Sequence, residues 1–265
     1  MKSIEYIYAN LETRTINVIE LKLSQNSKIG DGLVIQTYHF SIEQVSNNDI
    51  TLDSVNCLDC PLSRSNGYKL GMCYTHKGLQ LMGLKSKLRK LHKMYNNYDI
   101  CEFDQSTFDN WKKRVSMQLV KNIKFNSKLC SITQLDKMKD TFIKLCRFGA
   151  YGEPIFLGEN VTSQLSTMAK NITGYTHQYN KNQYNWANKF FMASTHNQLD
   201  KSIAKNRNFR QFNVVLKNEK IENSVNCPSS KEFEEANNKK VSCVDCSLCS
   251  GNFKNLKKDI HILAH

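Results

Sequence analysis

Seven of the ten cysteines fall into two groups whose spacing is typical of metal ligands. The first group is Cys57, Cys60 and Cys73, a CxxC pair followed by a third cysteine after twelve intervening residues. A CxxC pair lets two sulfurs from one turn bind the same ion, and three thiolates leave one coordination position open. The sequence therefore predicts a first metal site that is open to a substrate or cofactor. His76 as a fourth ligand would instead close it as a zinc site.

The second group is Cys227 with the tight run Cys243, Cys246 and Cys249. Four thiolates complete either a tetrahedral zinc site or a four-iron cluster. Structural zinc and a second iron–sulfur cluster both remain open interpretations of this group. The cysteines without a partner at useful spacing, which we interpret as ordinary thiols, are Cys101, Cys130 and Cys146.

Polar side chains follow several short apolar runs that read as strands. In parallel α/β folds the chemistry lies beyond the carboxyl ends of the strands, so these positions are candidates for a site. Buried hydrogen-bonded histidines, loop histidines and turn glycines are the simpler explanation of the same residues. The candidate catalytic residues are Arg147, Glu153, His177, Gln178 and His196, and the candidate cofactor-binding residues are Gly149, Tyr151, Gly152 and Glu153.

The pattern of apolar residues predicts the elements that must position these groups. Alternating stretches predict strands over residues 3–8, 15–23 and 33–40. From residue 106 onward, helical patterns alternate with short apolar runs, which favours βαβ units and a parallel sheet. We therefore expect an α/β fold, a complete or partial (β/α) barrel with parallel strands and cysteine-rich metal-binding loops. It should form one domain over 1–265, with a short β-rich N-terminal extension over 1–50 and a barrel-like core over 51–265.

The chain is strongly basic, with 37 Lys and Arg against 24 Asp and Glu and a formal charge of +13. This balance favours a nucleic acid or nucleotide partner, although lysine excess also serves solubility alone. Residues 76–93 predict an amphipathic helix with leucines on one face and only basic charges on the rest. No apolar run approaches the roughly 18 residues of a membrane span, and no signal peptide is recognisable. We expect a cytoplasmic protein with no membrane partner, in which paired cysteines bind metal rather than form disulfides.

An ordered set of motifs carries a first resemblance. The segments CLDCPLS, RFGAYGEP, TGYTHQY, FMAST, CPSSKE, CVDCSLC and IHILAH occur in this order along the chain. The set resembles a family of uncharacterised tailed-bacteriophage proteins over nearly the whole length from about Asn26. The resemblance implies a phage-encoded protein in the host cytoplasm and assigns no activity.

A looser resemblance is to the radical S-adenosylmethionine enzymes. These are (β/α) barrels in which three cysteines after the first strand hold a [4Fe-4S] cluster, and the second strand often ends in a Gly-Gly-Glu-Pro-like segment that touches the methionine amine. Tyr151-Gly152-Glu153-Pro154 is similar to that segment. The cysteine spacing departs from the usual CxxxCxxC of those enzymes.

Two hypotheses follow. The first is an iron–sulfur enzyme of the radical S-adenosylmethionine type that acts on a nucleotide, nucleic acid or peptide. In it the first cysteine group holds the cluster, and the polar strand ends bind the cofactor and substrate. The alternative is a non-enzymatic, zinc-stabilised phage protein that binds nucleic acid or a host factor through the basic helix.

Overall fold

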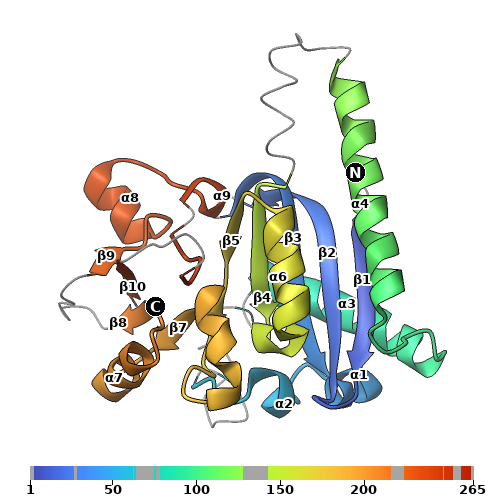
Figure 1. The fold of residues 1–265 in the computed structure, drawn as a ribbon, viewed down its shortest axis with the longest axis horizontal. Helices are drawn as coiled ribbons and strands as arrows, with labels where there is room; N and C mark the ends of the chain where they lie inside the picture. The colour runs from blue at the N-terminus through green and yellow to red at the C-terminus, as the bar shows by residue number, and fades with distance from the viewer. Residues whose placement is uncertain are drawn as a thin grey trace.

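The computed structural model of the chain describes residues 3–26, 29–61, 63, 75, 78–127, 143–215, 224–246, 248–252 and 258–263. Cys73, His76 and Cys130 lie outside the described residues. What is described is a mixed α/β fold with two sheets, both containing parallel strand pairs (Figure 1).

The first sheet has the strand order β1-β2-β3-β4-β5. Its strands are β1 (Ile4–Asn10), β2 (Thr15–Asn26), β3 (Gly30–Ser41), β4 (Leu145–Tyr151) and β5 (Asn171–Thr173). The first three strands pair antiparallel, whereas β3 pairs parallel with β4 and β4 with β5. The N-terminal strands are therefore built into the main sheet through β3, where the sequence predicted an extension.

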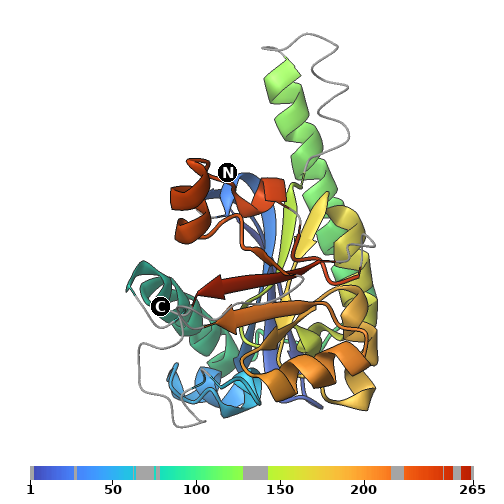
Figure 2. The same ribbon diagram turned by 90° about the vertical axis from the view of Figure 1, so that its left-hand side faces the viewer.

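The second sheet is parallel throughout and has the order β6-β7-β8-β10-β9. Its strands are β6 (Tyr175–Thr176), β7 (Met192–Thr195), β8 (Gln211–Val215), β9 (Ser224–Asn226) and β10 (Asp259–Leu263). Only Gly174 separates β5 from β6, so one stretch of chain contributes an edge to each sheet. The strands of the second sheet run across the direction of the first (Figure 2). The strand pairings of the described residues do not close into a barrel.

Helices cover both faces of the first sheet, and α7 packs on the second. The described helices are α1 (Ile42–Asn47), α2 (Ser54–Cys57), α3 (Gly78–Asn96), α4 (Gln105–Ser127), α6 (Gly158–Met168), α7 (Gln198–Asn206), α8 (Lys231–Asn237) and α9 (Cys243–Cys246), with 3-10 helices η2 (Pro154–Leu157) and η3 (Asn182–Lys189). Helix α4 packs along β1 and continues beyond the ends of the strands (Figure 1).

Strand β2 shows why the sheet has two buried faces. Ile19 and Leu21 pack into a core formed with α4, η2 and α6, whereas Ile16 and Val18 pack into another core formed with α1 and α3. Successive side chains of a strand point to opposite faces, so this alternation places helices on both sides. The parallel strands are thereby held rigidly, and their carboxyl ends are left to carry the polar residues.

Candidate functional site

Three neighbouring strand ends bring Glu153, His177 and His196 into one hydrogen-bonded chain. Glu153 Oε1 accepts from the backbone N–H of His177 at 3.0 Å and lies 2.9 Å from His177 Nδ1. Its other oxygen accepts from the Thr176 hydroxyl at 2.7 Å. His177 Nε2 lies 3.2 Å from His196 Nε2, and the two rings stack with centroids 5.4 Å apart. These residues follow β4, β6 and β7, so the structure gathers them at the end where the sequence placed them.

The turn after β4 fixes where Glu153 lies. Gly152 has a φ of +73°, and a Cβ there would stand 2.5 Å from the carbonyl oxygen of His39. Only glycine fits such a position without displacing backbone. Gly149 also has a positive φ, +64°, and its N–H donates to Thr37 Oγ1 at 2.9 Å. The predicted cofactor glycines thus shape the turn that delivers Glu153, which is 4% exposed.

The electrostatics divide the two histidines into a charged and a neutral one. Burial disfavours the imidazolium of His177, but the side chains of Cys60 and Glu153 favour it more strongly, and the pKa of His177 is raised to about 10. Burial and the charge of His177 lower the pKa of His196 to about 4. His177 therefore donates from both ring nitrogens, to Glu153 and to His196, while neutral His196 accepts at Nε2.

The loop after β3 carries Cys57 and Cys60 to the same place. Cys57 ends α2, and the N–H of Cys60 donates to the Cys57 carbonyl at 3.0 Å, so one tight turn holds both thiols. The backbone N–H of Glu153 donates to the Asn56 carbonyl at 2.8 Å, which ties this turn to the end of β4. The Cys60 side chain lies within hydrogen-bonding reach of His177. The Cys60 thiol, two imidazoles and a carboxylate therefore meet at this edge, with Cys57 on the same turn as Cys60.

The second cysteine group gathers around Tyr175 in β6. Burial raises the pKa of the Cys249 thiol, and the neighbouring thiols of Cys227, Cys246 and Cys243 raise it further. The Tyr175 hydroxyl lies within hydrogen-bonding reach of Cys249. The four predicted ligands are thus within electrostatic range of one another, although 22 residues separate Cys227 from Cys249 in the sequence.

Binding of a metal ion requires the side chains to lie close enough to contact the same ion, which electrostatic range alone does not provide. Within the part of the chain that is described, no three His, Cys, Asp or Glu side chains are placed so that they could hold a metal ion. The first group is represented there by two of its three cysteines, because Cys73 lies outside it. The second group is fully described and is drawn together without forming a ligand set. Metal binding by the cysteine-rich loops therefore remains a prediction.

Two further predicted site residues are used elsewhere in the fold. Arg147 is the third residue of β4, opposite Gln36 of β3, and its charge acts on Tyr38. Tyr151 is 2% exposed, and its hydroxyl accepts from Gln44 Nε2 at 2.8 Å. Arg147 lies within the strand and Tyr151 is buried in the core beside Asn56 and Cys57, and their roles at the site remain predictions.

Gln178 does lie beside the chain of polar residues. Its backbone N–H donates to Thr176 Oγ1 at 3.0 Å, and that hydroxyl in turn donates to Glu153. Its side chain is fully buried, and neither atom of its amide has a hydrogen-bond partner among the described residues. Asn56 is also fully buried, and its Oδ1 has no hydrogen-bond partner within the same part of the chain.

The sequence reasoning missed three residues that support the site. Thr176 binds Glu153, Asn56 anchors the cysteine turn, and the Asp200 carboxylate accepts from the backbone N–H of His196 at 3.1 Å. Thr176 directly precedes His177 at a strand end, so its position was a usable signal. No pattern in the sequence indicates the other two, since their roles depend on contacts between distant segments.

The basic helix forms as predicted, with Leu84, Leu88 and Leu91 buried on one face of α3. Two of its lysines form ion pairs with acidic residues of β1 and β2. Lys87 Nζ lies 3.0 Å from a Glu5 oxygen and 3.4 Å from a Glu20 oxygen. Lys90 also pairs with Glu5. The basic residues of α3 that remain exposed without an ion pair to these acids are Lys85, Arg89 and Lys93.

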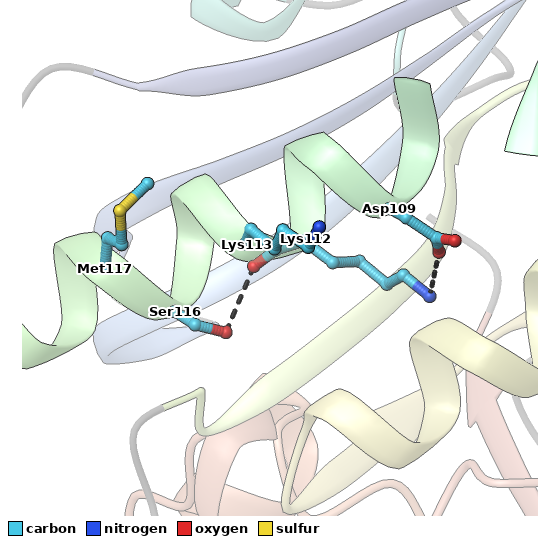
Figure 3. A pocket seen from close by; sticks show the side chains of 5 residues that line it. All are labelled: Asp109, Lys112, Lys113, Ser116 and Met117. Atoms are coloured by element: carbon cyan, nitrogen blue, oxygen red, sulfur yellow. Dashed lines mark hydrogen bonds and ion pairs between the residues drawn. The ribbon is translucent and has the colours of Figure 1, made fainter. Parts of the chain in front are cut away.

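A hollow on α4 lies apart from the strand ends. It is lined by Asp109, Lys112, Lys113, Ser116 and Met117, all from the one helix (Figure 3). The Lys112 amine pairs with Asp109 at 2.7 Å, and the Ser116 hydroxyl donates to the Lys112 carbonyl at 3.0 Å. These groups satisfy one another, so we assign no site here.

No described helix is both long and apolar enough to cross a membrane. Comparison of the chain with protein-family models, with curated proteins and with solved structures gave no match.

Proposed function

We propose that this protein is an iron–sulfur enzyme of the radical S-adenosylmethionine type. Cys57, Cys60 and Cys73 would hold a [4Fe-4S] cluster beside the chain of Glu153, His177 and His196. The substrate class that its charge of +13 favours is a nucleotide or nucleic acid. The observation that carries the proposal is the contact between Cys60 and His177, because it places the cysteine turn at the ends of the parallel strands.

The order of the parallel strands supports the proposal. The parallel strands follow chain order within each sheet, β3, β4 and β5 in the first and β6, β7, β8 and β10 in the second, and the chain passes from β5 to β6 through Gly174. A partial (β/α) barrel has this order, and in it the cysteine turn follows the first parallel strand and Glu153-Pro154 the second. The same order of parts occurs in the enzymes that the chain resembles.

The donor chemistry of the turn fits such a cluster. Both thiols are half-buried on one turn, and thiolates are the ligands of iron–sulfur clusters. When bound, the cluster would supply one-electron chemistry.

The polar residues have roles of their own in the proposed enzyme. A carboxylate has about four acceptor positions, and Glu153 already uses three of them on Thr176 and His177. We therefore assign Glu153 to orienting His177, with one acceptor position left for a cationic amine. His177 donates one N–H to Glu153 and the other to His196, and we assign the pair of histidines to proton transfer toward a bound substrate.

The alternative, a zinc-stabilised nucleic-acid-binding protein, has weaker support. Lys87 and Lys90 are held by acids of the sheet, which reduces the free charge of α3. A binding protein also has no need for buried Glu153 and His177 at the strand ends.

Anaerobic reconstitution with iron and sulfide tests the choice. We expect brown protein whose reduced form gives the electron paramagnetic resonance signal of a four-iron cluster, and a change of that signal on addition of S-adenosylmethionine. The double variant Cys57→Ser/Cys60→Ser should lose the part of the four-iron resonance signal that changes on addition of S-adenosylmethionine. The matched control Cys101→Ser changes an exposed single thiol and should retain it. Colourless wild-type protein with stoichiometric zinc would refute the proposal and favour the alternative.

A further inference from the structure

The turn that ends α3 holds Tyr98 in a backbone conformation that a tyrosine rarely adopts. Its φ is +58°, in the left-handed region. The Tyr98 N–H donates to the Tyr95 carbonyl at 3.1 Å, and the Asp99 N–H donates to the Met94 carbonyl at 2.9 Å. This pair of bonds is the Schellman motif, in which glycine usually occupies the position of Tyr98 because a side chain there is strained.

The side chain of Tyr98 does not offset this strain by packing. It is 92% exposed, the largest value among the exposed large apolar side chains of the described residues. Strained backbone positions concentrate at functional sites, where the side chain is needed for a ligand. A strained position that holds an aromatic ring in solvent therefore indicates a surface that binds a ligand with that ring.

The exposed face of α3 beside this turn carries only positive charge. Lys93 lies in the last turn of the helix and Arg89 one turn before it, so the two side chains share a face. Neither forms an ion pair within the part of the chain that is described, because the acids of β1 and β2 that face the helix bind two of its other lysines. Arg89 donates from Nε to the Lys85 carbonyl at 3.3 Å, which leaves the terminal N–H groups of its guanidinium for a ligand.

The turn lies at the same edge of the first sheet as the polar strand ends. The Ala9 N–H donates to the Cys101 carbonyl at 2.8 Å. Ala9 pairs with Ile16, and Ile16 pairs with Phe40 near the end of β3. Neighbouring strands lie about 5 Å apart, so the chain just after this turn lies roughly 15 Å from the end of β3. A single strand of about five nucleotides, at roughly 3.4 Å each, spans that distance.

We propose that Tyr98, Arg89 and Lys93 form a binding surface for single-stranded nucleic acid. Tyr98 stacks on an unpaired base, and the two cations bind the neighbouring phosphates. Asp99 repels phosphate on its own side of the ring, which leaves the α3 side for the backbone of the strand. An anionic lipid surface matches the cations but gives the ring no stacking partner. The inference names the substrate class of the proposed function, and it rests on that function only in treating the bound strand as a substrate.

Binding of a fluorescent oligothymidylate of about twelve nucleotides, within the site sizes of single-strand-binding proteins, is measured by anisotropy with the full-length chain. Tyr98→Gly removes the ring and supplies the residue that favours the left-handed conformation, whereas Tyr98→Phe keeps the ring. The matched control is Leu79→Ala, which removes an apolar side chain that is 85% exposed at the other end of the same helix.

We expect Tyr98→Gly to weaken binding about fivefold to a hundredfold, the effect of losing one stacked base. Its melting temperature should stay the same or rise by a few degrees, because glycine relieves the strain at this position. Tyr98→Phe and Leu79→Ala should bind as the wild type does. Equal binding by Tyr98→Gly and the wild type would overturn the inference. A fall in the melting temperature of Tyr98→Gly would also do so, because the ring would then belong to the fold.

A second pair of variants tests the cations. Arg89→Gln/Lys93→Gln is compared with Lys239→Gln/Lys240→Gln, which lowers the net charge equally at exposed positions in another part of the chain. The first pair should reduce the slope of log affinity against log salt by about 1.4, since each phosphate contact contributes about 0.7. The second pair should leave the slope unchanged. Equal slopes in the two double variants would assign binding to net charge alone and overturn the inference.

Two parallel measurements separate this inference from its competitors. Binding to phosphatidylglycerol vesicles without binding to the oligonucleotide would assign the surface to lipid and overturn the inference. Iron content and the resonance signal that responds to S-adenosylmethionine are recorded on the same protein. A chain that incorporates no iron and still binds the strand through Tyr98 would refute the proposed function and keep this inference. A chain with a responsive cluster and no affinity for the strand would do the reverse.

Discussion

Replacing Glu153 by Gln removes the charge that organises the strand-end site while keeping its shape. The carboxylate of Glu153 accepts from the Thr176 hydroxyl, from the His177 backbone N–H and from the His177 ring. A Gln side chain has only one oxygen, so its NH₂ group must face at least one of these donors. The protonated ring of His177 then loses the carboxylate that neutralises it.

The size of the effect follows from burial. Glu153 is 4% exposed and the His177 side chain 16%, so water screens the pair only weakly. Removing one partner of a buried ion pair destabilises proteins by about 3–5 kcal/mol, because the other charge is left uncompensated. The variant can reduce this loss by deprotonating His177. We therefore expect about 3 kcal/mol at pH 6, together with a fall in the pKa of His177.

Urea unfolding of the two proteins measures the difference, and nitrogen NMR of the imidazole rings follows the protonation of His177. Glu159→Gln is the matched control, since Glu159 is exposed in the first turn of α6 and its replacement should change stability by less than about 0.5 kcal/mol. Equal stability of Glu153→Gln and Glu159→Gln would refute the buried ion pair, as would an unchanged pKa of His177.

Three further predictions concern the frame of the site. Burial lowers the pKa of His39 to about 3 in the folded state, whereas in the unfolded chain this histidine becomes protonated below pH 6.5. Protonation of His39 therefore favours the unfolded chain. The contribution of His39 to the free energy of unfolding should be fully present above pH 6.5 and fall toward pH 3. In urea titrations between pH 7 and pH 4.5, the free energy of unfolding of His39→Gln should decrease by about 2–3 kcal/mol less than that of the wild type. Gly152→Ala should destabilise by about 3 kcal/mol, because it adds a clash with the His39 carbonyl to the strain of a positive φ. Gly158→Ala has a similar φ of +74° and open space, so calorimetry should show a loss of only about 1–2 kcal/mol. Leu88→Ala, in the core beneath α3, should cost about 2–5 kcal/mol, whereas Leu79→Ala at an 85% exposed position of the same helix should be nearly silent in the same assay.

Much of the secondary structure could be predicted from the sequence. Alternation of apolar residues indicated β1, β2 and β3, and helical spacing of Leu84, Leu88 and Leu91 indicated α3. Helix α8 was missed, because seven residues without a strong apolar pattern give no periodic signal. The role of the first 50 residues was also misjudged. The pairing of β3 with β4 joins segments about 110 residues apart, and no local pattern encodes it.

For the site, the sequence determined which groups stand at strand ends, because polar residues directly after apolar runs mark those ends. It thereby identified Glu153, His177 and His196, which the structure brings into contact. It leaves the roles of Arg147 and Tyr151 as predictions, since the direction of a strand side chain depends on register.

The sequence alone determined which reactive groups the chain carries: thiols in CxxC spacing, a carboxylate, two imidazoles and an excess of positive charge. Only the tertiary structure decided which of these groups meet. The folded chain brought Cys60 to His177 beside Glu153, where the side chains of Cys60 and Glu153 keep His177 charged and burial, together with the charge of His177, keeps His196 neutral. Contacts between distant segments, and the desolvation that they impose, are properties of the packed chain and not of any local stretch of it.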